Sequence, residues 1–433
     1  MRSSSDTQPR RNQAIRNQAI RNKATRNKAT PVAAAVGAGA AVLFLLAAVA
    51  EGLARAQDSI GLPDVPSGKN PSPGAGVNVP ANRRARLFRR CQAARPGACF
   101  ELAVLLDFGQ GVTPDKPRAR RLYAKACGLG HGTGCNNLGA MWFAGEAGAK
   151  NRVQARHFYK KACDLRSGRG CSNYAFLLKH GQGGAMDRVQ ARTFYQLSCK
   201  LREGDGCVGA GIMWAHGQGG AKNLFRARIL YDTACRLGSG RGCTNVGYFW
   251  DTGQGGAKDQ AKARVLYEKA CRMGRAAGCN NLGISWRDGD GGAVDYRRAR
   301  RFLQRACTLG SAGGCHGLGH LMTQGRGGRK DAVRARQIYR LGCGKGYARS
   351  CTALGFLWDM GRGGAKDQRR ARTLYGKGCG LGSGQGCFNL GLSWQNGEGG
   401  PRSPGTAIRF FRKACSLGLQ KACHKTRLRR RRR

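Results

Sequence analysis

The cysteines of this chain occur in pairs that return at a fixed interval. All 20 cysteines fall into ten pairs, in which the second cysteine follows eight positions after the first, and each pair follows the previous one by 36 residues. A fixed period of this length, without insertion or deletion, indicates one supersecondary unit repeated along the chain. The pairs are Cys91 and Cys99, Cys127 and Cys135, Cys163 and Cys171, Cys199 and Cys207, Cys235 and Cys243, Cys271 and Cys279, Cys307 and Cys315, Cys343 and Cys351, Cys379 and Cys387, and Cys415 and Cys423.

Each repeat opens with a short segment of helical periodicity. In the fifth repeat, Val246 and Trp250 follow Cys243 at intervals that place all three on one side of a helix. We expect this first helix to begin at Cys243 and to end at Gly253, because glycine recurs at that position in nine repeats. Glycine readily adopts the positive φ that commonly ends a helix.

A second helical segment follows a recurrent polar residue. Eight of nine repeats have Asp or Asn at the position of Asp259, and the ninth has Ser403, all of which are favourable N-caps. Ala263, Tyr267 and Cys271 then recur at helical spacing. Neither helix is long enough to be stable alone in water, so neighbouring repeats must bury the apolar sides of both. We therefore predict an all-α fold, a right-handed α/α solenoid of 36-residue helix-turn-helix repeats.

The tryptophans occupy one position of the repeat. Leu106, Leu178 and Met322 occupy it in the other full repeats. An aromatic series of this kind could form a platform for a ligand, but its replacement by Leu and Met favours packing in the core. The six tryptophans are Trp142, Trp214, Trp250, Trp286, Trp358 and Trp394.

Taken together, these positions resemble a known repeat. The pattern L-G-x-x-W-x-x-G-x-G-G-x-x-D-x-x-x-A-R-x-x-Y-x-K-A-C over residues 91–423 resembles the Sel-1-like repeat, a relative of the tetratricopeptide repeat. The paired cysteines resemble those of its secreted bacterial cysteine-rich branch. The ninth repeat departs from the pattern at Pro401, Pro404 and Ile408. The resemblance implies a scaffold for protein binding, and a β-lactamase-like or penicillin-binding hydrolase as an alternative.

The cysteine pairs are best explained as disulfides. Each pair joins the last turn of one helix to the first turn of the next, where two helix ends in contact bring the Cα atoms within disulfide distance. Such a short loop contributes about 2.5 kcal/mol of stability in the chain-entropy model. Structural zinc sites use closer spacings and four ligands, and a C-x-x-C redox motif is absent. His316 and His320 could form one isolated metal site, but packed or solvated histidines are the simpler interpretation.

The N-terminal sequence predicts export. Residues 31–50 contain no charged residue and follow a basic stretch, and Ala54-x-Ala56 matches a signal-peptidase site. Cleavage would leave the repeats periplasmic or secreted, whereas an uncleaved segment would anchor them in the inner membrane. Disulfides persist in such oxidising compartments. The predicted segments are a basic low-complexity leader (1–30), a signal peptide or membrane anchor (31–56), a flexible linker (57–82), a solenoid of about nine full repeats and a partial tenth (83–424), and a disordered basic tail (425–433).

The formal net charge of +53 is extreme. Arginines recur on the second helices and are expected to form cationic ridges, which would bind anionic envelope polymers with strong salt dependence. The alternative is that an arginine-rich surface only keeps a repeat protein soluble. The recurrent arginine pairs include Arg226 and Arg228, Arg298 and Arg300, and Arg334 and Arg336.

No sequence motif assigns a catalytic residue, a cofactor or a metal. H-E-x-x-H, G-x-S-x-G, S-x-x-K with a following K-T-G, and a P-loop ending in G-K-[ST] are all absent. The favoured function is therefore an exported, disulfide-stabilised and monomeric scaffold that binds a protein or peptide partner. We expect its groove to be lined by exposed positions of the first helices, namely Asn136, Asn137, Asn173, Asn280, Asn281 and Asn389.

The disulfide assignment predicts a definite chemical result. Alkylation and mass spectrometry of the exported protein should find ten local disulfides and no free thiol. We expect this result because two adjacent helix ends carry only the two cysteines of one pair. Bridges between different pairs, or a majority of free thiols, would contradict the assignment.

Overall fold

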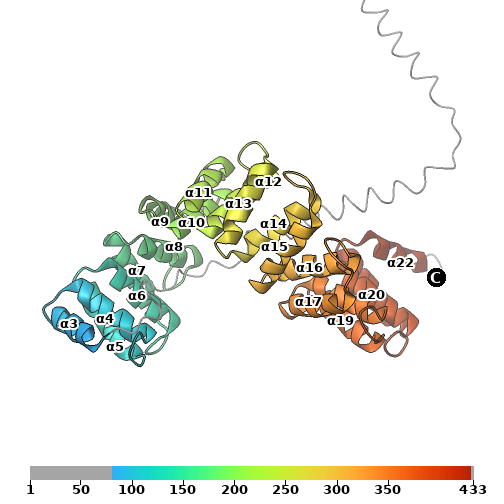
Figure 1. Cartoon of the computed structure of the whole chain (residues 1–433), viewed down its shortest axis with the longest axis horizontal. Coiled ribbons are helices and arrows are strands. Elements are labelled where there is room, and N and C mark those ends of the chain that lie inside the picture. The colour runs from blue at the N-terminus through green and yellow to red at the C-terminus, as the bar shows by residue number, and fades with distance from the viewer. Residues whose placement is uncertain (1–79, 431–433) are drawn as a thin grey trace, which may run out of the picture. The chain divides into compact units, whose positions relative to one another are not determined.

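The computed structural model describes residues 80–430, and these residues form 20 helices and no strand. The predicted leader, the signal peptide or anchor, and all of the predicted linker except its last residues lie outside this range. Figure 1 shows the helices following one another in chain order as antiparallel pairs, and each helix packs against the next. This arrangement is the predicted α/α solenoid.

Each repeat consists of an even-numbered first helix and an odd-numbered second helix. The first helices are α4 (Pro96–Phe108), α6 (Gly132–Ala144), α8 (Gly168–His180), α10 (Gly204–His216), α12 (Gly240–Thr252), α14 (Ala276–Asp288), α16 (Ala312–Gln324), α18 (Ala348–Asp359), α20 (Gly384–Asn396) and α22 (Gln420–Arg430). The second helices are α3 (Ala81–Gln92), α5 (Lys116–Gly128), α7 (Arg152–Asp164), α9 (Arg188–Lys200), α11 (Leu224–Arg236), α13 (Gln260–Arg272), α15 (Tyr296–Thr308), α17 (Ala332–Gly344), α19 (Gln368–Gly380) and α21 (Pro404–Ser416).

The helix ends are set by capping residues. The Asp259 side chain accepts a hydrogen bond from the backbone N–H of Lys262 and so caps α13, as predicted. Gly253 ends α12 with a φ of 74°. The predicted start of the first helix at Cys243 is three residues late. Ser239 caps α12 by accepting from the N–H of Gly242, so the helix already begins at Gly240.

The glycine-rich turn between the two helices rests on the preceding repeat. Gly255 has a φ of 70°, and a Cβ atom added there would collide with the carbonyl oxygen of Leu224, at the start of α11. Gly256 faces the guanidinium of Arg228 in the same way. Glycine is therefore required for two reasons, because the turn needs positive φ and because its backbone lies directly against the neighbouring second helix.

Ten disulfides close the junctions between repeats. Each bridge joins a second helix to the next first helix, as Cys235 of α11 joins Cys243 of α12. The Cα atoms of the bridged cysteines are 4.4 to 4.9 Å apart, which lies in the normal range. The other nine bridges join Cys91 to Cys99, Cys127 to Cys135, Cys163 to Cys171, Cys199 to Cys207, Cys271 to Cys279, Cys307 to Cys315, Cys343 to Cys351, Cys379 to Cys387, and Cys415 to Cys423. All 20 cysteines are paired, with the partners that the sequence predicted.

The core lies between the two helices of each repeat and at their contacts with neighbouring repeats. Tyr267 of α13 is fully buried and packs its ring on Gly247 of α12, where a Cβ atom would approach the ring to 2.8 Å. The tyrosine hydroxyl donates to the buried carboxylate of Asp251 at 3.3 Å. First helices also contact each other directly, as α8 contacts α10. The lack of a side chain at Gly247 therefore allows α12 and α13 to pack closely.

The C-terminal basic segment differs from the prediction. Residues 425–430 continue α22 as a helix, so the predicted disordered tail is wrong as far as Arg430. Residues 431–433 lie outside the described range. Among the helices of residues 80–430, none combines the length and the apolar composition that crossing a membrane requires.

The packing of the turn predicts different costs for two glycine substitutions. Gly274 has a φ of 74°, close to the 70° of Gly255, but has open space around its Cβ position. Gly274→Ala should therefore lower the free energy of unfolding only by the left-handed backbone penalty of about 1–2 kcal/mol. Gly255→Ala should cost a further ~1–3 kcal/mol because it also overpacks the contact with Leu224. Urea unfolding followed by circular dichroism compares the two, and equal destabilisation would show that this contact is unimportant.

Candidate functional site

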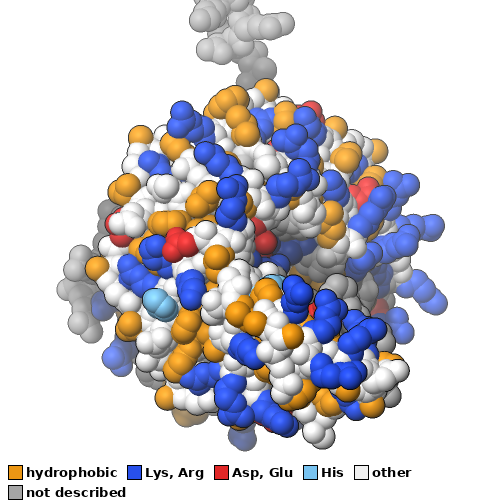
Figure 2. Space-filling model, turned by 90° about the vertical axis from the view of Figure 1, so that its left-hand side faces the viewer, with side chains coloured by type: hydrophobic (Ala, Val, Ile, Leu, Met, Phe, Trp, Pro, Cys, Tyr) orange, Lys and Arg blue, Asp and Glu red, His pale blue; other side chains and the backbone are white. Residues whose placement is uncertain are grey.

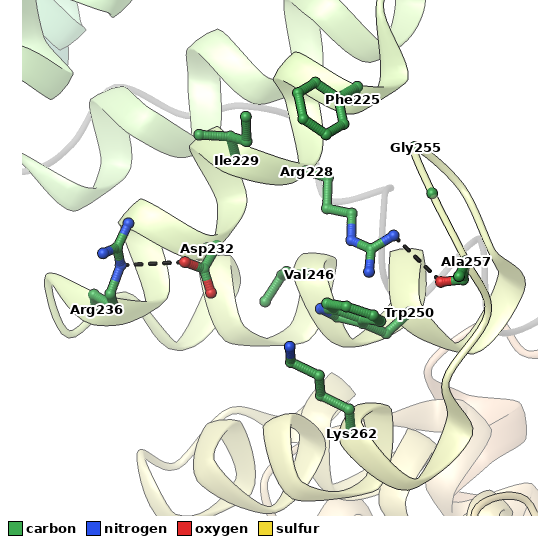
Figure 3. A pocket seen from close by; sticks show the side chains of 11 residues that line it. Phe225, Arg228, Ile229, Asp232, Arg236, Val246, Trp250, Gly255, Ala257 and Lys262 are labelled. Carbon is green, nitrogen blue, oxygen red and sulfur yellow. Dashed lines mark hydrogen bonds and ion pairs between the residues drawn. The ribbon is translucent and has the colours of Figure 1, made fainter.

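In every second helix from α5 to α19, an arginine reaches into the next repeat, whereas α21 has Ile408 at this position. The guanidinium carbon of Arg228 in α11 lies 3.2 Å from the ring centroid of Trp250 in α12, and Nη1 donates to the carbonyl oxygen of Ala257 at 3.3 Å. Figure 3 shows the side chain between the tryptophan ring and the glycine-rich turn. One arginine thus fixes both the tryptophan and the turn of the following repeat.

This arrangement recurs at every tryptophan. The guanidinium carbons lie 3.2 to 4.2 Å from the ring centroids. Three of the arginines, Arg264, Arg336 and Arg372, are buried, and burial lowers their pKa values, although a guanidinium remains charged at neutral pH. The pairs are Arg120 with Trp142, Arg192 with Trp214, Arg228 with Trp250, Arg264 with Trp286, Arg336 with Trp358, and Arg372 with Trp394.

The predicted cationic ridges need correction for this reason. The second arginine of each predicted pair, such as Arg228 or Arg336, contacts the next repeat. It therefore does not form part of an open cationic ridge. The first arginine of each pair is exposed, but it too has local partners. Arg298 lies 3.4 Å from its helix cap Asp295, and its guanidinium lies 4.5 Å from the Trp286 ring centroid.

The tryptophans pack against the core, as the sequence predicted, and lie at its edge where neighbouring repeats meet. Only Trp214 is buried, and the other five are half-buried. The Trp250 ring lies between Arg228 and Lys262, whose Nζ is 3.8 Å from the ring centroid (Figure 3). Cations therefore cover both of its faces, so the ring itself offers no free surface on which a ligand could stack.

A pocket of about 500 Å³ lies beside this junction, between α11, α12 and α13. Phe225 and Ile229 of α11 form one wall, and Val246 and Trp250 of α12 line the pocket below them (Figure 3). We call this the Trp250 pocket; its remaining lining residues are Arg228, Asp232, Arg236, Gly255, Gly256, Ala257 and Lys262.

Sequence reasoning missed the residues of this wall. Phe225 and Ile229 are 63% and 48% exposed, although both are large and apolar. They are four residues apart and lie on an exposed side of α11. The sequence does contain a signal for this wall. Phe225 and Ile229 are two apolar residues at helical spacing, and they lie outside the apolar side that recurs in the second helices.

The predicted asparagine groove is not open. Five of the six side chains are at most 2% exposed, so the expectation that they line an exposed surface is wrong. The amide of Asn173 donates to Asn136 of the preceding repeat at 2.8 Å, and Asn136 donates to Asn137 at 3.2 Å. These amides therefore link first helices across the repeat junction. The five are Asn136, Asn137, Asn173, Asn280 and Asn281, whereas Asn389 is half-buried.

The two histidines singled out in the sequence lie together on α16. The ring centroids of His316 and His320 are 6.5 Å apart, and the two rings are nearly parallel. Burial lowers the pKa of His316 to about 3, and His320 together with Arg349 and Arg287 acts in the same direction. In the part of the chain that the structure describes, no group of three His, Cys, Asp or Glu side chains is placed to hold a metal ion.

The fold and its junctions define a disulfide-stapled α/α solenoid. The Sel1 repeat matches nine consecutive segments of the chain, so the protein belongs to the Sel1 repeat family. The matched residues are 96–131, 133–167, 168–202, 205–239, 240–274, 276–311, 312–347, 348–383 and 384–419.

A solved structure shows the same fold over most of the chain. The c5321 protective antigen of uropathogenic Escherichia coli, which has an SLR fold, is 23% identical, with 81% of this chain and 82% of that chain covered and a TM-score of 0.59. Two further solved structures are similar to parts of the chain. Cysteine rich protein B of Helicobacter pylori is 31% identical, covering 29% of this chain and 90% of its own, with a TM-score of 0.25. A Sel1 repeat protein of Oxalobacter formigenes is 24% identical, covering 52% of this chain and 91% of its own, with a TM-score of 0.49. No curated protein matches the sequence.

The role of Arg228 can be separated from that of an ordinary surface arginine. Arg228→Gln should lower the free energy of unfolding by about 1–3 kcal/mol, because it removes a hydrogen bond between repeats and a contact with the Trp250 ring. Arg236 lies on the same helix, and both of its partners belong to that helix: Asp232 at 3.1 Å and the hydroxyl of Thr233 at 3.4 Å. Arg236→Gln should cost less than about 0.5 kcal/mol. Urea unfolding of both variants tests this, and a loss of stability for Arg228→Gln no larger than that for Arg236→Gln would argue against the junction role.

Proposed function

We propose that the protein is an exported scaffold that binds a protein or peptide partner in an oxidising compartment of the cell envelope. The ten disulfides are the observation that supports this most directly. They close every junction from Cys91 to Cys423, and bridges of this kind persist outside the cytosol. They also hold neighbouring repeats in a fixed register, which a surface for recognition requires.

The variation between repeats supports a binding role. Residues that shape the scaffold recur along the chain, including the capping Asp or Asn, the turn glycines and the cysteines. The exposed position two residues after the cap changes instead. It is occupied by Val153, Val189, Phe225, Ala261, Arg297, Val333 and Arg369 in successive repeats. A constant scaffold that presents different side chains is suited to recognising one particular partner.

The predicted export of the chain forms part of the proposal. The uncharged segment 31–50 and Ala54-x-Ala56 favour export with cleavage, which would place the repeats in the periplasm or outside the cell. An anchor in the inner membrane formed by residues 31–50 would expose the repeats to the same compartment. Both routes are compatible with the ten disulfides.

A specific surface supports polyanion binding as a second candidate. Arg297, Arg301 and Arg305 of α15 are exposed and follow one another at four-residue intervals along one side of the helix. Within residues 80–430, no carboxylate oxygen lies within 4.0 Å of these three side chains. On the face shown in Figure 2, Lys and Arg side chains are spread among apolar ones, and acidic side chains are few. Anionic polymers would be attracted to such surfaces.

Capture from an envelope extract distinguishes these functions. The full chain with its disulfides intact should enrich a protein partner at about 0.15 M salt, whereas the reduced and alkylated chain should not. Binding to a protein partner should weaken less with salt than binding to heparin, which should fall steeply because many counterions are released. Equal capture by the reduced chain would contradict the scaffold proposal.

The polyanion candidate has its own control. Replacing Arg297, Arg301 and Arg305 by glutamine should reduce the slope of log affinity for heparin against log salt by about 2–3, roughly one for each anionic group that is no longer neutralised. The variant should still capture the protein partner. An unchanged heparin slope would exclude α15 as the anionic site.

A further inference from the structure

We infer that the Trp250 pocket is a docking site for an acidic peptide segment that carries a large apolar side chain. The inference rests on the proposed function, because it names the chemistry of the partner that the scaffold would bind. Three features of the pocket favour this ligand, namely its apolar wall, its charges and its shape.

The apolar wall is specific to one repeat. The two wall positions are occupied by Phe225 and Ile229 here, but by Val189 and Thr193 in the preceding repeat. In the following repeat they are Ala261 and Val265, and no other repeat places large apolar residues at both positions. Phe225 and Ile229 remain 63% and 48% exposed, so a partner group that covered them would remove apolar surface from water. Full burial of one large apolar side chain strengthens binding by about tenfold or more.

The charges around the pocket favour an acidic partner. The one carboxylate among the lining residues, that of Asp232, is already paired with Arg236 at 3.1 Å. Arg228 and Lys262 add two further positive charges on the two sides of the Trp250 ring. A carboxylate of the partner could pair with the Lys262 amine while an apolar side chain enters beside Ile229. A basic partner would be repelled at the same place, so the pocket discriminates by charge.

The shape of the pocket favours a peptide over a membrane surface. A recess of about 500 Å³ is of the size that accepts a side chain or a small ligand. Val246 of α12 is fully buried beneath the wall formed by α11, so the bottom of the recess is apolar, and an apolar group must enter the recess to gain from it. A peptide side chain can do this, whereas the headgroup region of a membrane presents phosphates to a recess of this kind.

A labelled peptide provides the test. The probe is a fluorescein-labelled peptide with one phenylalanine between glutamates, and its binding to the full, oxidised chain is followed by fluorescence polarisation at about 0.15 M salt. Replacing the phenylalanine of the probe by alanine should weaken binding about tenfold or more. Replacing its glutamates by glutamine should also weaken binding, because the pairing with Lys262 is removed.

Variants of the protein locate the site. Phe225→Ser combined with Ile229→Ser should weaken binding of the phenylalanine probe about tenfold or more, and Lys262→Gln should weaken it several-fold. Val265→Ser is the matched control, because Val265 is 67% exposed at the Ile229 position of the next repeat. This control should leave the affinity unchanged. The side chains of Phe225, Ile229 and Val265 are all large, exposed and apolar. An unchanged melting temperature would show that each variant folds.

Several results would overturn the inference. An alanine probe that binds as tightly as the phenylalanine probe would show attraction by charge alone. A double variant that binds like the wild type would place the site elsewhere. Binding to phosphatidylglycerol vesicles that depends on Phe225 and Ile229, without binding of the peptide, would assign the surface to a membrane. If the double variant still captures the same envelope protein as the wild type, this inference fails while the proposed function stands.

Discussion

The structure depends on how each second helix is fastened to the repeat that follows it. At its C-terminal end a cysteine forms a disulfide with the next first helix, as Cys235 does with Cys243. Near its N-terminal end an arginine such as Arg228 contacts the next tryptophan and donates to the next glycine-rich turn. Helices of about 13 residues are marginal alone, so these two attachments and the apolar contacts between them make the array one structure.

This double attachment uses part of the positive charge of the chain. Part of the arginine content serves the junctions, where guanidinium groups lie on indole rings and bond to backbone carbonyls. A guanidinium suits that place because it is planar, keeps its charge and offers several donors at once. The charge available to partners is therefore concentrated at other positions, such as Arg297, Arg301 and Arg305 of α15.

The same geometry creates the Trp250 pocket. The glycine-rich turn and the tryptophan are drawn against α11, and α13 begins beside them, so a recess remains between the two second helices. Other repeats have at most one large apolar residue at the two equivalent positions, but here Phe225 and Ile229 are both apolar and exposed. Two surface residues therefore give this recess an apolar wall without changing any residue that holds the junction.

The sequence by itself determined the period, the two helices of each repeat, the N-caps of the second helices and the cysteine pairing, because all of these are local features that recur from repeat to repeat. Only the tertiary structure decided the roles of the repeated polar residues. Asn136 and Asn173 have the composition of an open groove but are buried where first helices meet. Arg228 belongs to an arginine pattern that looks solvent-exposed, yet its partners come from residues 22 and 29 positions later. Periodicity shows which side of a helix is apolar, whereas the distance between neighbouring repeats decides which polar side chains become enclosed.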